Sequence, residues 1–116
     1  MMKKINGKKI NILGEEWTII NEKNQDKCLK LEADGLCEAW SRQILIDDFE
    51  KTETTIYKMD KYKDKVLRHE IIHAFLFESG LAHSSNDGWA VNEEMVDYFA
   101  VQIPKMAKLF KELEIS

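Results

Sequence analysis

The first half of the chain alternates apolar and polar residues with a period of two, which is typical of strands that bury one face. Turn-forming residues such as Gly14 and the Asp34-Gly35 pair separate these runs. The apolar members of the runs are Ile10 and Ile12, Trp17 and Ile19, Leu29 and Leu31, and, within Gln43–Asp47, Ile44 and Ile46. We therefore expect residues 1–50 to be mainly strands in a small, mostly antiparallel sheet.

From residue 58 to residue 80 the pattern changes to that of a helix. Its apolar residues spread around almost the whole circumference, and a helix of that kind is buried. They are Val66, Leu67, Ile71, Ile72, Ala74, Phe75, Leu76 and Phe77. Gly80 suits the end of this helix, because glycine is favoured just past the last helical residue. The segment from Leu81 to Ala90 is rich in Ser, Asn, Asp and Gly, so we expect a loop there.

A second helix is expected over residues 91–114. Asn92 is a good N-cap residue, and the acidic Glu93 and Glu94 suit the positive end of a helix. Pro104 lacks a donor N–H and clashes with the preceding turn, so the helix should kink near it. Together these elements predict one α+β domain over residues 1–116, in which a small sheet packs on two helices.

Composition narrows the class of protein. With 116 residues, of which 44% are hydrophobic, the chain can build one compact core but not a second domain. No stretch reaches the ~18–20 apolar residues of a membrane span, and no apolar leader follows the basic start. We therefore expect no membrane partner and a cytoplasmic location. Cys28 and Cys37 do not form a CxxC pair; we expect free thiols in the core, with a disulfide as the alternative.

The charge pattern argues against a nucleic-acid partner. The formal net charge is -4, and Asp60 and Asp64 interrupt the richest basic run, Lys58 to Lys65. Phosphate binding requires an uncompensated basic face, which this run does not supply. We expect it to be the solvated face of a helix.

Candidate chemistry lies in the first helix, at His69, Glu70 and His73. Residues four apart on a helix lie about 40° apart around it and roughly 6 Å apart along it. Both imidazoles can therefore bind a single tetrahedral ion. Glu70 points about 100° away from His69, where it cannot bind the ion but can reach a water held there. The spacing predicts two metal ligands and one general base.

A catalytic zinc site needs a third protein ligand, with the fourth position open to water. The downstream candidates are His83, Glu93 and Glu94. Glu93 and Asp97 are four residues apart and share a helix face, so Glu93 can bind the metal while Asp97 accepts the far N–H of a ligand histidine. We therefore favour Glu93 as the ligand. The alternative is that Glu93 only complements the helix N-terminus, which is the role we expect for Glu94.

These motifs resemble those of a known family. Residues 69–73, HEIIH, followed by residues 92–97, NEEMVD, resemble the HExxH and NExxxD motifs of gluzincins, which are zinc metallopeptidases of the thermolysin type. The continuation to Pro104 is similar to small ImmA/IrrE-like and phage-encoded minimal gluzincins. The motifs of the resemblance lie within residues 66–104. The first half of the chain resembles these proteins only in consisting of short strands. It implies a minimal zincin core, in which an active-site helix and a glutamate helix hold one zinc ion over a small sheet.

The resemblance also implies roles for these residues. It makes His69, His73 and Glu93 the zinc ligands, Glu70 the general base and Asp97 the partner of a ligand histidine. The implied activity is hydrolysis of a peptide or protein substrate, with a narrow target such as a regulator in phage or mobile-element control. The chain departs from the large gluzincins in having no counterpart of their C-terminal subdomain, which supplies half of the substrate cleft and the oxyanion contacts.

Several alternatives stay open. His83 could contact the oxyanion or the substrate, or be an ordinary loop histidine. Gln43–Asp47 could be a sheet edge that binds an extended peptide by strand addition. The chain could be a zinc-stabilised protein-binding module without useful hydrolytic activity, or a metal-free interaction domain with core histidines at 69 and 73. The oligomeric state, the substrate and the cleavage preference stay open as well.

Overall fold

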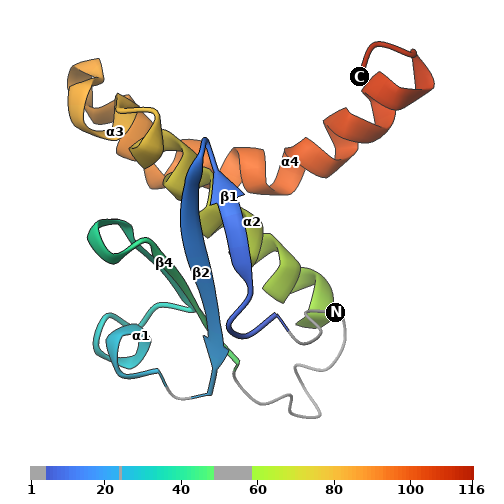
Figure 1. The fold of residues 1–116 in the computed structure, drawn as a ribbon. Coiled ribbons are helices and arrows are strands. Elements are labelled where there is room, and N and C mark those ends of the chain that lie inside the picture. The colour runs from blue at the N-terminus through green and yellow to red at the C-terminus, as the bar shows by residue number, and fades with distance from the viewer. Residues whose placement is uncertain (1–4, 24, 49–58) are drawn as a thin grey trace.

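A four-stranded sheet forms one side of the computed structural model, which describes residues 5–23, 25–48 and 59–116. Its strands are β1 (Lys9–Ile12), β2 (Glu15–Glu22), β3 (Gly35–Glu38) and β4 (Gln43–Asp47), in the spatial order β1-β2-β4-β3 (Figure 1). The pairings β1–β2 and β3–β4 are antiparallel, whereas β2 and β4 are parallel. Residues 49, 50 and 58, at the ends of the expected strand half and helix, lie outside the described residues.

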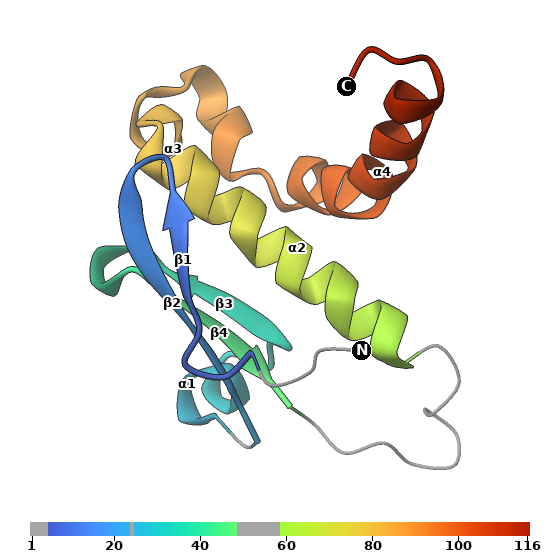
Figure 2. The same cartoon turned by 45° about the vertical axis from the view of Figure 1, so that its right-hand side comes forward.

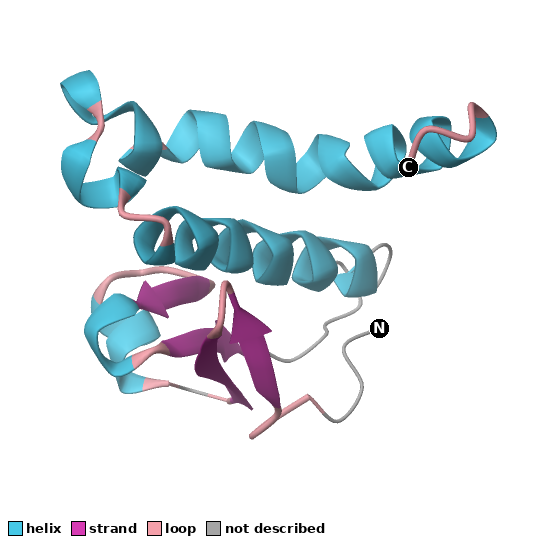
Figure 3. Cartoon of the chain, turned by 45° about the horizontal axis from the view of Figure 1, so that its top comes forward, coloured by secondary structure: helices cyan, strands magenta, loops and turns pink. Residues whose placement is uncertain are grey.

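The helices form two further layers. α2 (Met59–Glu78) packs on one face of the sheet, and α4 (Glu93–Glu112) crosses the other side of α2 (Figure 3). Two short helices, α3 (Leu81–Ser84) and η2 (Asn86–Val91), connect them. The expected α+β fold is therefore confirmed. No helix in the described part of the chain is both long enough and apolar enough to cross a bilayer.

The core lies between α2 and the sheet. Val66, Glu70 and Ala74 are spaced by four residues, so they form one stripe along α2, and all three are buried. This stripe faces the buried strand residues Trp17, Ile19, Ile44 and Ile46. On a third side of α2, Phe75 is 42% exposed, so the expectation of a helix buried all round is wrong there. The sheet and α4 cover two sides of α2 and leave this third side in contact with solvent.

The contact between α2 and α4 is close. Val96 and Ala100 of α4 are fully buried there, and the small Ala100 side chain allows the backbones to approach. Arg68 Nε donates a hydrogen bond of 2.7 Å to the carbonyl oxygen of Ala100. Beyond this contact α4 continues through Pro104 as one helix, and the ribbon bends along its length (Figures 1 and 2).

Two local predictions are wrong. The pair Leu29 and Leu31 belongs not to a strand but to α1 (Asp26–Lys30) and the turn after it. Both leucines are exposed, and Cys28, just before Leu29, is the buried residue of α1. Two apolar positions were therefore too few to define a period. The segment from Leu81 to Ala90 is also not a loop, because its residues form the turns of α3 and η2.

The sheet edge is not where the sequence hypothesis put it. β4 lies between β2 and β3, so strand addition to Gln43–Asp47 is excluded. Its consecutive residues Ile44, Leu45 and Ile46 are all buried, as is typical of an interior strand. β3 is the edge strand on this side. In the expected turn at Asp34-Gly35, Asp34 is a bend and Gly35 is already the first residue of β3.

Gly35 sets how closely β3 approaches α2. A Cβ atom at this position would lie 2.7 Å from Val66 Cγ1 and 3.1 Å from Glu70 Cγ. Gly35→Ala should therefore lower the free energy of unfolding by about 1–3 kcal/mol, the usual cost of overpacking. Urea denaturation measures this change. The penalty should shrink in a Val66→Ala background, where the clashing methyl group is gone. An equal penalty in both backgrounds would show that another contact is responsible.

Candidate metal centre

The two helices bring together three side chains from the two sequence motifs. His69 and His73 project from α2 toward the start of α4. The Asn92 side chain accepts a hydrogen bond of 2.8 Å from the Met95 backbone N–H, which is a standard N-cap contact. This cap begins α4 at Glu93, so the first side chain of the helix faces the two histidines.

The donor atoms of these residues converge on one point. Glu93 Oε1 lies 2.8 Å from His69 Nε2 and 2.9 Å from His73 Nε2. One ligand atom from each residue lies within 4.8 Å of the others. Burial disfavours the charge of Glu93, but the hydrogen bonds to His73 and His69 outweigh it and lower the pKa of this carboxyl. A carboxylate with two imidazoles is a donor set that a divalent metal can use.

His69 lies between two carboxylates, one at each ring nitrogen. Its Nε2 lies 2.8 Å from Glu93 Oε1, and its Nδ1 lies 3.2 Å from Asp97 Oδ1. A neutral imidazole has only one N–H and can donate to only one of these two carboxylates. Either a second proton on the ring, or a metal cation at Nε2 with the Nδ1–H donating to Asp97, would satisfy both nitrogens.

The distances also bear on the fit of a zinc ion. Zinc bonds of about 2.0–2.1 Å in a tetrahedral site place the ligand atoms about 3.3 Å apart. The separations of 2.8 and 2.9 Å to Glu93 Oε1 are shorter, so Glu93 must withdraw slightly to admit an ion. Its side chain is 76% exposed and has room to do so. The residues therefore fit a small divalent metal.

Glu70 lies in a different environment from Glu93. It is buried between α2 and the sheet, where its Oε2 would lie 3.2 Å from a Cβ atom at Gly35. The pKa of Glu70 is raised to about 7, mainly by burial; the charge of His69 opposes the shift and the charge of Glu93 adds to it. A carboxyl group with a pKa near neutrality can both accept and return a proton.

Asp97 has a partner that the sequence analysis missed. Lys65 Nζ lies 2.9 Å from Asp97 Oδ1, the same oxygen that faces His69 Nδ1. The hydrogen bond from Lys65 is the main reason why the pKa of Asp97 is lowered. Lys65 is four residues before His69, so the helical stripe could have revealed it. In the same basic run, Lys63 is buried and pairs with Asp48 at 2.7 Å, so the expectation of a purely solvated face is wrong.

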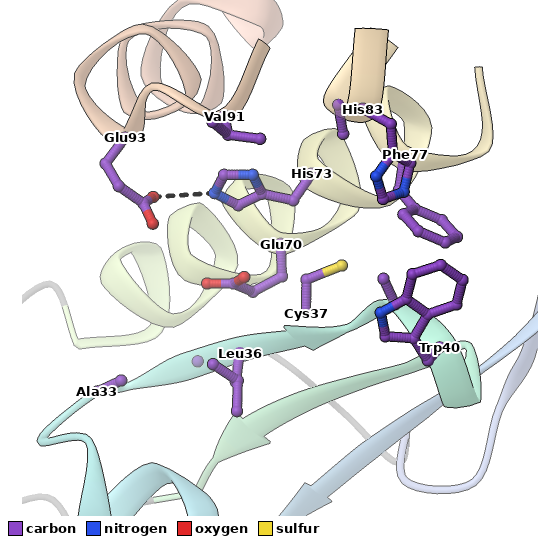
Figure 4. Close-up of a pocket in the computed structure, with 13 residues that line it drawn as sticks. Ala33, Leu36, Cys37, Trp40, Glu70, His73, Phe77, His83, Val91 and Glu93 are labelled. Atoms are coloured by element: carbon purple, nitrogen blue, oxygen red, sulfur yellow. Dashed lines mark hydrogen bonds and ion pairs between the residues drawn. The ribbon is translucent and has the colours of Figure 1, made fainter. Parts of the chain in front are cut away.

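An open cavity of about 550 Å³ adjoins two of the three donors, His73 and Glu93. Its polar end contains Glu70, His73 and Glu93 (Figure 4). β3 forms one wall, and α3 and Val91 border the other side. The volume is in the range of small-ligand sites, so a short peptide segment can enter.

The remaining candidates occupy distinct places. His83 lies in α3 and lines the same cavity, where its ring is 5.6 Å from the Trp40 ring and 5.1 Å from the Phe77 ring. It stands at the end away from Glu93 (Figure 4). Glu94 is exposed in the first turn of α4 and lies outside the group of donors. Cys28 and Cys37 are both free, and Cys37 lines the cavity, where burial raises the pKa of its thiol to about 12.

Sequence reasoning missed the cavity wall. Gly35, Cys37, Trp40 and Phe77 all line it, yet only their non-local arrangement gives them this role. Nothing in the local pattern around Trp40 indicates that it follows an edge strand.

Comparisons with known proteins found no relative of this chain. No family model matches the chain, and no curated protein or solved structure matches it either.

Proposed function

We propose that this chain is a zinc-dependent peptidase of the gluzincin type with narrow specificity. One observation carries the proposal: the donor atoms of His69, His73 and Glu93 converge beside Glu70 at the end of an open cavity. Two histidines and a glutamate are the protein ligands of a catalytic zinc that keeps one position open. A zinc ion bound there would polarise a substrate carbonyl and lower the pKa of a coordinated water to about 7.

Glu70 has the environment of a general base. It accepts a proton from the attacking water and later delivers it to the leaving amine. Its pKa of about 7, raised by burial, matches both transfers near neutral pH. Asp97 faces His69 Nδ1 and is itself held by Lys65, so this carboxylate orients the imidazole without touching the reacting atoms.

The position of β3 supports a peptide as the substrate. The Asp47 N–H donates a hydrogen bond to the Asp34 carbonyl. Hydrogen-bonded residues alternate along an antiparallel pair, so the backbone groups of Leu36 also point toward β4. The backbone N–H and C=O groups of Gly35 and Cys37 then point away from β4, along the sheet edge that borders the cavity. An extended peptide can pair with such groups.

The test combines metal content with hydrolysis. The purified, untagged protein should hold about one equivalent of zinc by elemental mass spectrometry. Glu93→Ala should lose this zinc, whereas Glu94→Ala should keep it and serves as the matched control because it removes the neighbouring, exposed carboxylate. Incubation with a complex peptide mixture should then give new termini by mass spectrometry, which a zinc chelator abolishes.

The outcomes separate the candidate functions. Zinc that depends on Glu93, together with chelator-sensitive cleavage, supports the peptidase. Zinc without cleavage of any peptide would leave the zinc-stabilised binding module in its place. A protein that holds no zinc after reconstitution would end the proposal.

A further inference from the structure

The two ends of the cavity at the candidate metal centre differ in chemistry. Glu70, His73 and Glu93 make one end polar, whereas the other end consists of rings and aliphatic side chains (Figure 4). The rings are those of Trp40, Phe77 and His83, and their chain neighbours Ala39 and Ala82 also line the cavity. A ligand that spans the cavity therefore meets a charged site at one end and an apolar surface at the other.

The three rings form one cluster although they come from three elements. Trp40 follows β3 in η1 (Ala39–Ser41), Phe77 is on α2 and His83 is on α3. The Trp40 and Phe77 rings lie 5.3 Å apart at an interplanar angle of 84°, an edge-to-face contact. Phe77 also contacts the buried Trp17 ring at 6.2 Å, which anchors the cluster to the core.

Much of this apolar surface faces solvent. Trp40 in particular is 85% exposed. Covering such surface releases about 25 cal/mol per Å² of apolar area, and tryptophan is enriched among the residues that dominate binding energy. A large apolar side chain placed here would gain contacts with several rings, whereas a small one would cover little of this surface.

The spacing connects this cluster to the candidate metal centre. Phe77 is four residues after His73 on the same helix, so it lies one turn, roughly 6 Å, farther along α2. An extended peptide advances about 3.3 Å per residue. A side chain one or two residues from a peptide bond held at His73 and Glu70 therefore reaches the rings.

We propose that Trp40, Phe77 and His83 form a side-chain subsite that selects peptides with a large apolar residue, aromatic before aliphatic, within two residues of the bond to be cut. This inference rests on the proposed peptidase function and names the substrate class of that site. It also gives His83 a role in substrate contact instead of in oxyanion stabilisation.

Binding is tested on zinc-loaded protein carrying Glu70→Gln, so that turnover does not interfere. The probes are end-blocked heptapeptides of alanine and glycine in which a single phenylalanine is moved through each position, with the all-alanine/glycine peptide as reference. The three Trp indole N–H signals are followed by NMR and assigned with Trp40→Phe and Trp89→Phe. The Trp40 signal should shift with phenylalanine peptides, with at least about tenfold tighter binding than the reference.

Variants identify the residues responsible. Trp40→Ala should abolish the preference for phenylalanine, and Trp40→Phe should retain most of it. Trp89→Ala is the matched control, because Trp89 is another exposed tryptophan, 48% accessible, that does not line the cavity. Equal affinity for all the peptides, or a preference unchanged by Trp40→Ala, would overturn the subsite.

Hydrolysis by the parent protein then separates this inference from the proposed function. Cleavage within two residues of phenylalanine supports both. Cleavage without regard to phenylalanine overturns the subsite alone. Selective binding without cleavage of any peptide rejects the peptidase but keeps the subsite as a peptide-binding site.

Discussion

Glu70→Gln should lower the rate of peptide hydrolysis by about a hundredfold to ten-thousandfold while leaving the zinc content at that of the parent. The glutamine side chain has nearly the same shape but cannot accept a proton from water. The metal donors, His69, His73 and Glu93, are unchanged. Initial rates on a cleaved peptide, measured with elemental analysis of the same sample, check both parts. A variant that keeps the parent rate would remove Glu70 from the mechanism.

The same variant supplies its own control for folding. In the metal-free protein, burial raises the pKa of Glu70 from 4.5 to about 7, so the folded state binds a proton that the unfolded state has released between these values. Stability should therefore fall as pH rises from about 4.5 to about 7. Glu70→Gln lacks this titration, so above pH 7 it should be more stable than the parent by on the order of 3 kcal/mol.

Denaturation of the metal-free proteins across this pH range measures the difference. A loss of hydrolysis in a variant that is more stable than the parent cannot be due to unfolding. If the parent and Glu70→Gln show the same dependence of stability on pH, the carboxyl group is not protonated in the folded state. Its proposed environment would then be wrong.

Zinc should raise the melting temperature of the protein on the order of 15 °C. A ligand that binds only the folded state at a thousand times its dissociation constant stabilises it by about 4 kcal/mol, and a domain of this size gains several degrees per kcal/mol. The gain arises because the three donors come from α2 and α4, which are brought together only by folding. Calorimetry of metal-free and zinc-loaded protein measures the shift.

His73→Ala should abolish this shift, because it removes one of the three donors. His83→Ala is the matched control: it removes the third histidine of the chain, which lies outside the donor group, and should leave the shift intact. Magnesium, which prefers oxygen ligands, should have little effect. A zinc shift that survives in His73→Ala would place the metal elsewhere.

Where the structure departs from the sequence predictions, the missing information is non-local. The edge of the sheet depends on which strands pair, and pairing partners lie far apart in sequence. β4 pairs with β2 in parallel and with β3 antiparallel, so the run that looked like an edge is interior. The role of Trp40 follows only from this topology, as does the close approach of Gly35 to Glu70.

Features that depend on short-range geometry could be predicted from the sequence alone. The four-residue spacings of His69 and His73 and of Glu93 and Asp97 each put two side chains on one helix face, and Asn92 sets where the second helix begins. That these two faces meet, with Glu93 Oε1 2.9 Å from His73 Nε2, follows from the packing of the whole fold. Helix periodicity and capping are local properties of the backbone, whereas the packing of α4 on α2, the edge position of β3 and the walls of the cavity depend on the whole core.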